Sequence, residues 1–238
     1  MKFEKKKMGK IVRLILSLIV IAIMIRQIFL KEWFMVFACI FTLIVFAIPR
    51  VFDKKFNIKF PMALEIAIYL FVFGAEIIGE IGEYYINVSW WDDLLHTVSG
   101  MLLAAVGLFF ISVLNNENKR LNLPVFYKVF ATFCFSITIL ALWECFEFGA
   151  DCLTGSDMQK DTFITTINSV DLNEKKVNKS VSLNIETIEV NGEDWMKKYG
   201  GYLDIGLYDT MYDLLDGLLG ASIYSIFSYF YLKKKQYN

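Results

Sequence analysis

The stretch IVRLILSLIVIAIMIRQIFL, residues 11–30, decides what kind of fold this chain can have. It is almost entirely apolar, and a helix of roughly 20 such residues crosses the hydrocarbon core of a bilayer. A cleaved signal peptide has a shorter apolar run that ends in small residues at a cleavage site, and neither feature is present here. The stretch therefore predicts a retained transmembrane helix.

The composition extends this prediction to the rest of the chain. Of the 238 residues, 56% are apolar, 16% are aromatic and 21% are charged, and the mean hydropathy is +0.48. These values exclude a disordered protein, a coiled coil and most cytosolic enzymes. The net charge is −1, and no basic face indicates a nucleic-acid partner. The four cysteines form no disulfide framework or C-x-x-C motif, so we expect them to pack as small hydrophobic residues.

Five further stretches are long and apolar enough to cross a membrane. The six predicted spans are 11–30, 32–49, 61–81, 92–114, 125–150 and 205–232. Pro49, Pro61 and Pro124 fall at predicted span ends, where a missing N–H is tolerated. The predicted fold is an all-α polytopic membrane protein, a six-helix transmembrane bundle with a small β-rich extracytoplasmic insertion between spans five and six.

The expected organisation has three parts: 1–151 with spans one to five, 152–204 as the insertion, and 205–238 with span six and a basic tail. The insertion is polar and has no helical period. Its runs TFITTINSV at 162–170 and VSLNIETIEV at 181–190 are β-branched and partly alternating, which predicts a hairpin or a small sheet.

Lysine and arginine cluster at alternate ends of the predicted spans. The clustered residues are Lys2, Lys5, Lys6, Lys7, Lys10, Arg50, Lys54, Lys55, Lys59, Lys119, Arg120, Lys128, Lys233, Lys234 and Lys235. The short loops at the opposite ends contain only Lys31. Because basic residues stay on the cytoplasmic side, we expect a plasma-membrane protein with both termini in the cytoplasm and 152–204 outside.

Acidic residues collect at three span ends that share one depth under this topology. They are Asp92 and Asp93 beside His96 in span four, Glu144, Glu147 and Asp151 in span five, and Asp209, Asp213 and Asp216 in span six. Spacings of three and four residues place each set on one helical face. The stripes of spans four and six lead into Gly100 and Gly220, which permit close helix contact. Charge inside a span costs roughly 2.5–3.5 kcal/mol and commonly marks function.

Such carboxylates cannot all be ionised side by side without compensation. A divalent cation or shared protons would compensate, and Arg26 could pair with some of the carboxylates but alone carries far too little charge. A non-functional explanation is also open for three of them: Asp92, Asp93 and Asp209 would be solvated acids at helix N-termini, where negative charge is favourable. The predicted cofactor, if any, is Mg²⁺, Mn²⁺, Ca²⁺ or Zn²⁺. The candidate metal ligands are Asp93, His96, Glu144, Glu147, Asp209, Asp213 and Asp216, and the candidate catalytic residues are His96, Glu144, Glu147 and Asp213.

Three segments that contain these residues resemble a known family. They are WDDLLHTVSG at 91–100, WECFEFGADCLTG at 143–155 and GLYDTMYDLLDGLLGA at 206–221. They are similar to the signature blocks of the YjdF-type bacterial membrane proteins and, more distantly, of the VanZ-like proteins. The resemblance implies that Asp93, His96, Gly100, Glu144, Glu147, Asp209, Asp213 and Gly220 belong to one unit. It implies no activity, and the long insertion after Gly155 departs from the short glycine-rich connection of the family.

Three function classes follow from these features. A metal-dependent intramembrane hydrolase or transferase would act on an envelope lipid or a lipid-linked substrate, with His96 or a carboxylate as acid or base. A cation- or proton-coupled transporter would use the same acids, but the inner half of the membrane contains only Glu65. A non-catalytic sensor or structural protein would use them to hold helices together. The lipid bilayer is the one partner that the sequence indicates.

Overall fold

The computed structural model describes the backbone of residues 2–117 and 122–237, and the side chains of 8–115 and 122–236. Its long helices are α1 (Lys2–Leu30), α2 (Trp33–Phe56), α3 (Met62–Val72) continued by η1 (Phe73–Ile81), α5 (Trp91–Glu117), α6 (Val125–Thr154) and α8 (Leu207–Tyr237). The basic residues Lys119 and Arg120 of the topology prediction lie outside the described residues.

Five helical segments among the described residues are long and apolar enough to cross a membrane. They are Met8–Leu30, Trp33–Phe56, Met62–Ile81, Trp91–Asn115 and Val125–Thr154. These segments confirm the first five predicted spans in type and approximate position. The helix α8, 31 residues long, is not among them, so the predicted sixth crossing is not confirmed.

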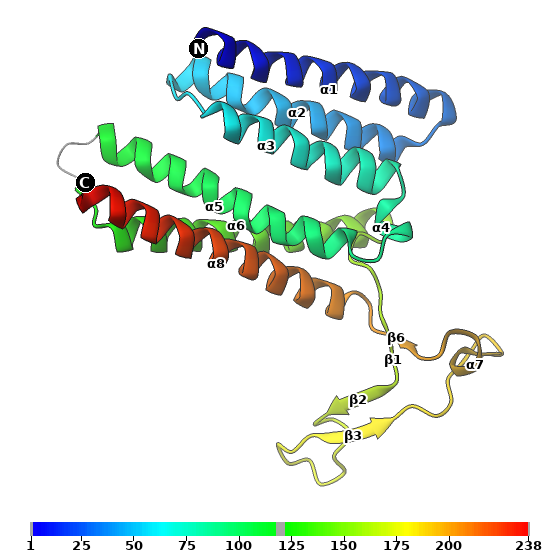
Figure 1. Cartoon of the computed structure of the whole chain (residues 1–238). Coiled ribbons are helices and arrows are strands. Elements are labelled where there is room, and N and C mark those ends of the chain that lie inside the picture. The colour runs from blue at the N-terminus through cyan, green and yellow to red at the C-terminus, as the bar shows by residue number, and fades with distance from the viewer. Residues whose placement is uncertain (1, 118–121, 238) are drawn as a thin grey trace. The chain divides into compact units, whose positions relative to one another are not determined.

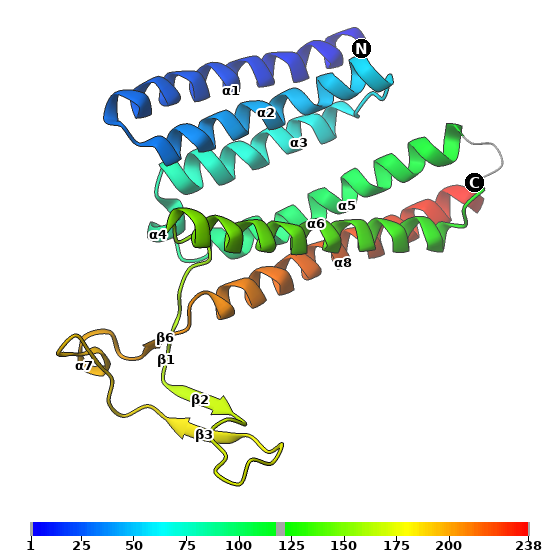
Figure 2. The same cartoon turned by 180° about the vertical axis from the view of Figure 1, so that it is seen from behind.

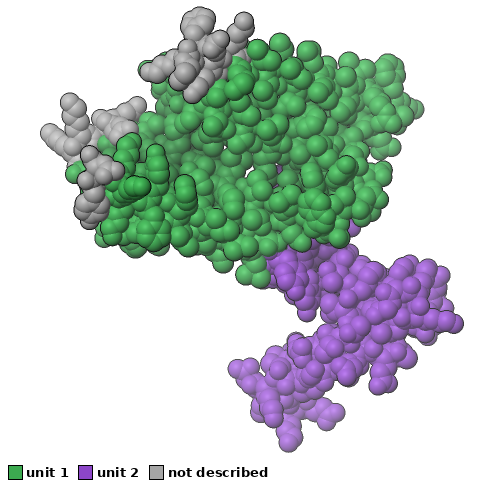
Figure 3. Space-filling model, in the orientation of Figure 1, with its two compact units in different colours: residues 1–141, 213–238 green, residues 142–212 purple. Residues whose placement is uncertain are grey.

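The chain divides into two compact units (Figure 3). Unit 1 comprises 1–141 and 213–238, and unit 2 comprises 142–212. Because the unit boundaries fall inside α6 and α8, each of these helices contributes to both units.

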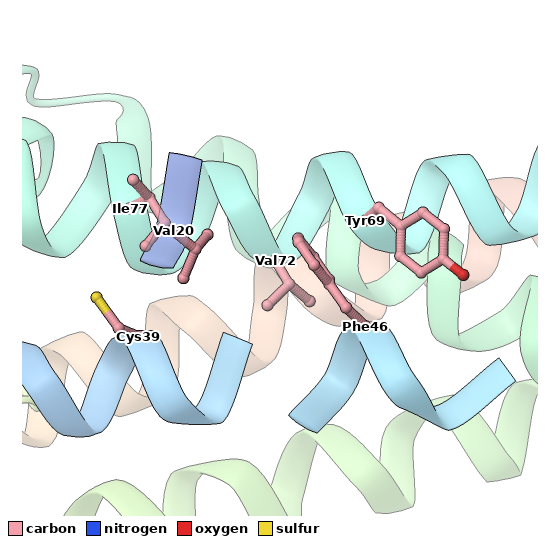
Figure 4. Close-up of a cluster of buried hydrophobic side chains, with 6 residues drawn as sticks. All are labelled: Val20, Cys39, Phe46, Tyr69, Val72 and Ile77. Atoms are coloured by element: carbon pink, nitrogen blue, oxygen red, sulfur yellow. The ribbon is translucent and has the colours of Figure 1, made fainter. Parts of the chain in front are cut away.

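In unit 1, α1, α2 and α3 lie side by side (Figures 1 and 2). Large apolar side chains fill the space between them. The buried cluster consists of Val20, Cys39, Phe46, Tyr69, Val72 and Ile77 (Figure 4). The rings of Phe46 and Tyr69 meet edge to face with centroids 5.2 Å apart. The free thiol of Cys39 is buried, as expected for a small packed side chain, whereas Cys134, Cys145 and Cys152 are exposed, contrary to that expectation.

Two features of the first spans differ from the sequence prediction. The helix α2 continues through Pro49 to Phe56, so the prediction that the span ends at Pro49 was wrong. Pro49 is buried, and a helix held by its neighbours tolerates the one hydrogen bond that proline removes. The second feature is η1, a π-helix that carries Glu76 and Glu80 in the last part of span three, and no sequence pattern indicated it.

Unit 2 contains short strands in place of an extended sheet. The strands β2 (Thr166–Ser169) and β3 (Val181–Asn184) pair antiparallel, with Thr166 opposite Asn184, which agrees with the predicted hairpin. The strands β1 (Phe163–Ile164) and β6 (Tyr202–Leu203) pair at the base of the insertion. The remaining elements of the insertion are β4 (Glu189–Val190), β5 (Glu193–Asp194) and α7 (Trp195–Tyr199). A further short helix, α4 (Tyr84–Asn87), belongs to unit 1.

Candidate functional site

The candidate site of unit 1 lies where α5 and α8 touch through glycines. A Cβ on Gly100 would overlap the backbone oxygen of Gly217, and a Cβ on Gly220 would overlap that of Thr97. Only glycine lets the two backbones approach this closely. Ala104 and Ala221 continue the contact as fully buried small residues. Gly100 and Gly220, which were predicted to permit close helix contact, both lie at this crossing, and Gly217 lies there as well.

One helical turn before these glycines, His96 meets two aspartates. Its Nε2 atom lies 3.4 Å from Oδ1 of Asp92 and 3.4 Å from Oδ2 of Asp213. Asp213 is 4% exposed, and the three side chains form a group whose ligand atoms all lie within 4.8 Å of one another. The close crossing causes this meeting, since His96 and Asp213 each precede a contact glycine by four residues.

The first part of α6 supports the crossing. The hydroxyl of the buried Ser136 donates a 2.9 Å hydrogen bond to the backbone oxygen of Gly100. Leu140, one turn further along α6, packs against the bare Cα of Gly217, where its Cδ1 lies 2.5 Å from the position of a missing Cβ. Leu140 thus fills the space that the missing side chain of Gly217 leaves, and α6 contacts both helices of the crossing.

Two predicted metal ligands lie at the edge of this group. Asp93 is exposed, and the structure places the neighbouring Asp92 against His96 instead. Asp216 is half-buried one turn after Asp213 and interacts electrostatically with Asp93, His96 and Asp92. Both residues add negative charge around the group without belonging to it.

The α6 carboxylates belong to unit 2 and are described on their own. Glu144 and Glu147 are buried, and the indole Nε1 of Trp143 donates a 2.8 Å hydrogen bond to Oε1 of Glu147. Their expected convergence with the residues of the other helices stays a prediction.

Asp209, the remaining predicted ligand, takes part in the backbone structure of unit 2. Its Oδ2 accepts a 2.9 Å hydrogen bond from the amide of Lys160. Asp151 has a similar position on α6, because it accepts hydrogen bonds from the amides of Met158 and Gln159. In the same loop, burial and then the nearby carboxylate of Asp157 raise the pKa of Asp161. Asp151 and Asp209 therefore anchor the segment that leads from α6 into the strands.

Asp92 is one of the acidic residues found at the span ends, but it was not among the predicted metal ligands. Helical spacing favours Asp92 and Asp93 equally, because offsets of four and three residues from His96 both lie on its face. Gly217 and Ser136 were not predicted from the sequence. Gly217 could have been found, because its spacing of three residues from Gly220 places both glycines on one helical face. Nothing in the sequence distinguishes Ser136 from other serines in the spans.

The apolar helices and the glycine-mediated crossing define the chain as a multi-pass helical membrane protein. It belongs to a family described as Predicted membrane protein (DUF2238), whose model matches residues 10–234. This match is consistent with the resemblance to the YjdF-type proteins and gives no support to the more distant similarity to VanZ-like proteins. No curated protein and no solved structure matches the chain.

Proposed function

We propose that Asp92, His96 and Asp213 bind a divalent cation inside the membrane, and that this cation serves metal-assisted hydrolysis or transfer on an envelope lipid or a lipid-linked substrate. The observation that carries the proposal is the pair of 3.4 Å distances from His96 Nε2 to the two carboxylates. Direct hydrogen bonds to nitrogen span about 2.7–3.2 Å. Ligands at roughly 2.0–2.1 Å from a tetrahedral cation are instead separated by about 3.4 Å.

The donor set favours Zn²⁺ among the cations considered. One imidazole nitrogen and two carboxylate oxygens resemble a catalytic zinc site, in which three protein ligands leave a fourth position for water or substrate. Mg²⁺ and Ca²⁺ prefer sets made of oxygen alone. A cation in this position would supply a bound water of lowered pKa and would polarise a phosphoryl or acyl group.

The proposed topology places this site in the outer half of the plasma membrane. In this topology α8 is the sixth span and both termini are cytoplasmic. Two observations support it. The start of α1 and the end of α8 lie at the same end of unit 1 in both views (Figures 1 and 2). Large apolar residues along α8, among them Ile226, Phe227 and Phe230, are exposed as lipid-facing residues would be.

A second candidate function rests on the same two distances. A protonated His96 would interact favourably with both aspartates and would hold α5 and α8 together without a metal. In that case the protein would be a non-catalytic membrane protein, in agreement with the structural alternative from the sequence. The metal content and the metal response of the purified protein separate the two functions.

The test measures zinc in the purified full-length protein and its melting temperature after chelation and after return of Zn²⁺. At a Zn²⁺ concentration about 100 times the Kd, the melting temperature should rise by roughly 5–10 °C. His96→Gln should abolish both the bound zinc and the rise. Asp93→Asn is the matched control, because Asp93 is an exposed neighbour of Asp92 and should leave both unchanged.

If the wild-type protein contains no zinc and does not respond to Zn²⁺ or Mn²⁺, the metal proposal is wrong. The second candidate, a non-catalytic protein in which protonated His96 pairs with the aspartates, would then stand. Turnover is tested separately in liposomes of bacterial lipid extract, with and without Zn²⁺, by mass spectrometry of the lipids. Loss of one lipid in the wild type but not in Asp213→Asn would support the enzyme. Bound zinc without any lipid change would restrict the function to cation binding.

A further inference from the structure

A largely apolar groove opens between α3 and α5, and Tyr224 of α8 also lines it. It has a volume of about 640 Å³. Pro61, Leu64 and Ala67 line one wall, and Met101, Ala105 and Phe109 line the other. The small side chains of Ala67 and Ala105 leave the space open. The volume lies within the roughly 300–1,000 Å³ typical of ligand sites.

A second apolar groove, of about 320 Å³, lies beside the C-terminal part of α5. Ile58, Phe110 and Leu114 are among its lining residues. The buried ring of Phe60 contacts a lining residue of each groove, with its centroid 4.7 Å from Phe109 of the first and 5.7 Å from Phe110 of the second. Ile58 lines the second groove and Pro61 lines the first. Lys59 follows Ile58 in this segment and is exposed.

Positive charge surrounds this point. Arg50, Lys54, Lys55 and Lys59 are all exposed in the loop and the adjoining end of α2, against the single half-buried acid Asp53. Lys59 lies in the loop between the spans Trp33–Phe56 and Met62–Ile81, and Arg50, Lys54 and Lys55 lie in the last two turns of the first span. Both positions are near a span end, the level at which lipid headgroups lie. Basic pockets between transmembrane helices on the cytoplasmic side bind anionic headgroups.

We propose that this region binds one anionic diacyl phospholipid, with its phosphate at Lys59 and one acyl chain in each groove. Two apolar grooves near one exposed lysine match the two chains and the single headgroup charge of such a lipid. A neutral lipid would fill the grooves without using the surrounding basic residues. This site is independent of the cation site, because it shares no side chain with His96, Asp92 or Asp213.

The experiment compares phosphatidylglycerol with phosphatidylcholine of identical chains, each added to the purified full-length protein in detergent. Native mass spectrometry counts the retained lipids, and thermal unfolding measures the stabilisation. Phosphatidylglycerol should give one retained lipid and, at about 100 times its Kd, a melting temperature higher by roughly 5–10 °C. Chelation of metal should leave this response unchanged, which separates the lipid site from the cation site.

Two variants with matched controls locate the site. Lys59→Gln should weaken phosphatidylglycerol binding about fivefold, the effect of one lysine near a membrane surface. The control is Lys234→Gln, which removes an exposed lysine near the end of α8. Ala67→Phe should fill the larger groove and reduce the response to both lipids. Its control is Ala22→Phe, at an exposed position of α1 that does not line the groove.

Three outcomes would overturn the proposal. Equal stabilisation by both lipids would remove the headgroup preference. Equal effects of Lys59→Gln and Lys234→Gln would reduce the preference to general surface charge. Ala63 and Ala67 are exposed small residues four apart on α3, a pattern that also suits helix contact. If Ala67→Phe abolishes a crosslinked dimer and leaves the lipid response intact, a second copy of the chain covers the groove.

Discussion

Unit 1 holds its helices together in two different ways. Between α1, α2 and α3, side chains as large as Phe46 and Tyr69 fill the space and keep the backbones apart (Figure 4). Between α5 and α8, glycines replace side chains and the backbones touch. Polar groups one turn away can then meet, as His96 and Asp213 do. The comparison indicates that the first contact provides stability and the second provides a site.

The largest expected effect comes from breaking the apolar contact. Phe46→Ala removes a side chain that is 2% exposed. It should lower the free energy of unfolding by about 3 kcal/mol. This is the lower end of the range for such substitutions, because the competing solvent in a membrane is lipid and not water. Thermal unfolding measures this, with the exposed Phe37→Ala on the same helix as a near-neutral control. The zinc response should survive in Phe46→Ala, and its loss would show that the two contacts are not separate.

A smaller loss of stability with a larger loss of function should follow from Gly100→Ala. The new Cβ would meet backbone atoms of Gly217, which cannot move aside cheaply, so we expect a loss of about 1–3 kcal/mol. Because the crossing positions His96, the zinc response should disappear as well. Gly149→Ala is the control, since nothing lies within 4 Å of its Cβ position, and it should stabilise α6 by about 0.5–1 kcal/mol. Full zinc binding by Gly100→Ala would show that close contact is unnecessary.

The two contacts also differed in how far the sequence predicted them. The apolar spans were clear from their length, but α2 passes through Pro49 and span three ends as a π-helix, because packing overrides local preference. At the second contact, the polar stripe that leads from His96 into Gly100 indicated that α5 could approach a neighbouring helix closely. It could not choose between Asp92 and Asp93, since that choice depends on how α5 is rotated against α8. Rotation is set by tertiary contacts such as that of Leu140 with Gly217.

The sign of a third effect distinguishes a cation site from an ion pair. In metal-free protein, Asp213→Asn removes one of two like charges beside His96. If His96 is neutral there, repulsion is relieved and stability should rise by about 1 kcal/mol, or roughly 2–4 °C in melting temperature. The same variant should no longer respond to Zn²⁺. If metal-free Asp213→Asn melts at a lower temperature than the wild type, His96 is protonated and the ion pair is the structural element. Asp93→Asn should change neither value.

The smallest expected effect concerns the hydrogen bond that joins α6 to the crossing. Ser136→Ala removes the 2.9 Å bond from its hydroxyl to the backbone oxygen of Gly100, and hydrogen bonds between membrane helices contribute about 0.6 kcal/mol. Ser99 is the matched control, because its hydroxyl bonds to the carbonyl of His96 within its own helix. Ser136→Ala should therefore lower the melting temperature by one or two degrees, roughly, and weaken zinc binding slightly, whereas Ser99→Ala should leave zinc binding unchanged. Equal effects of the two substitutions would mean that the serine of α6 does not help to hold the crossing in place.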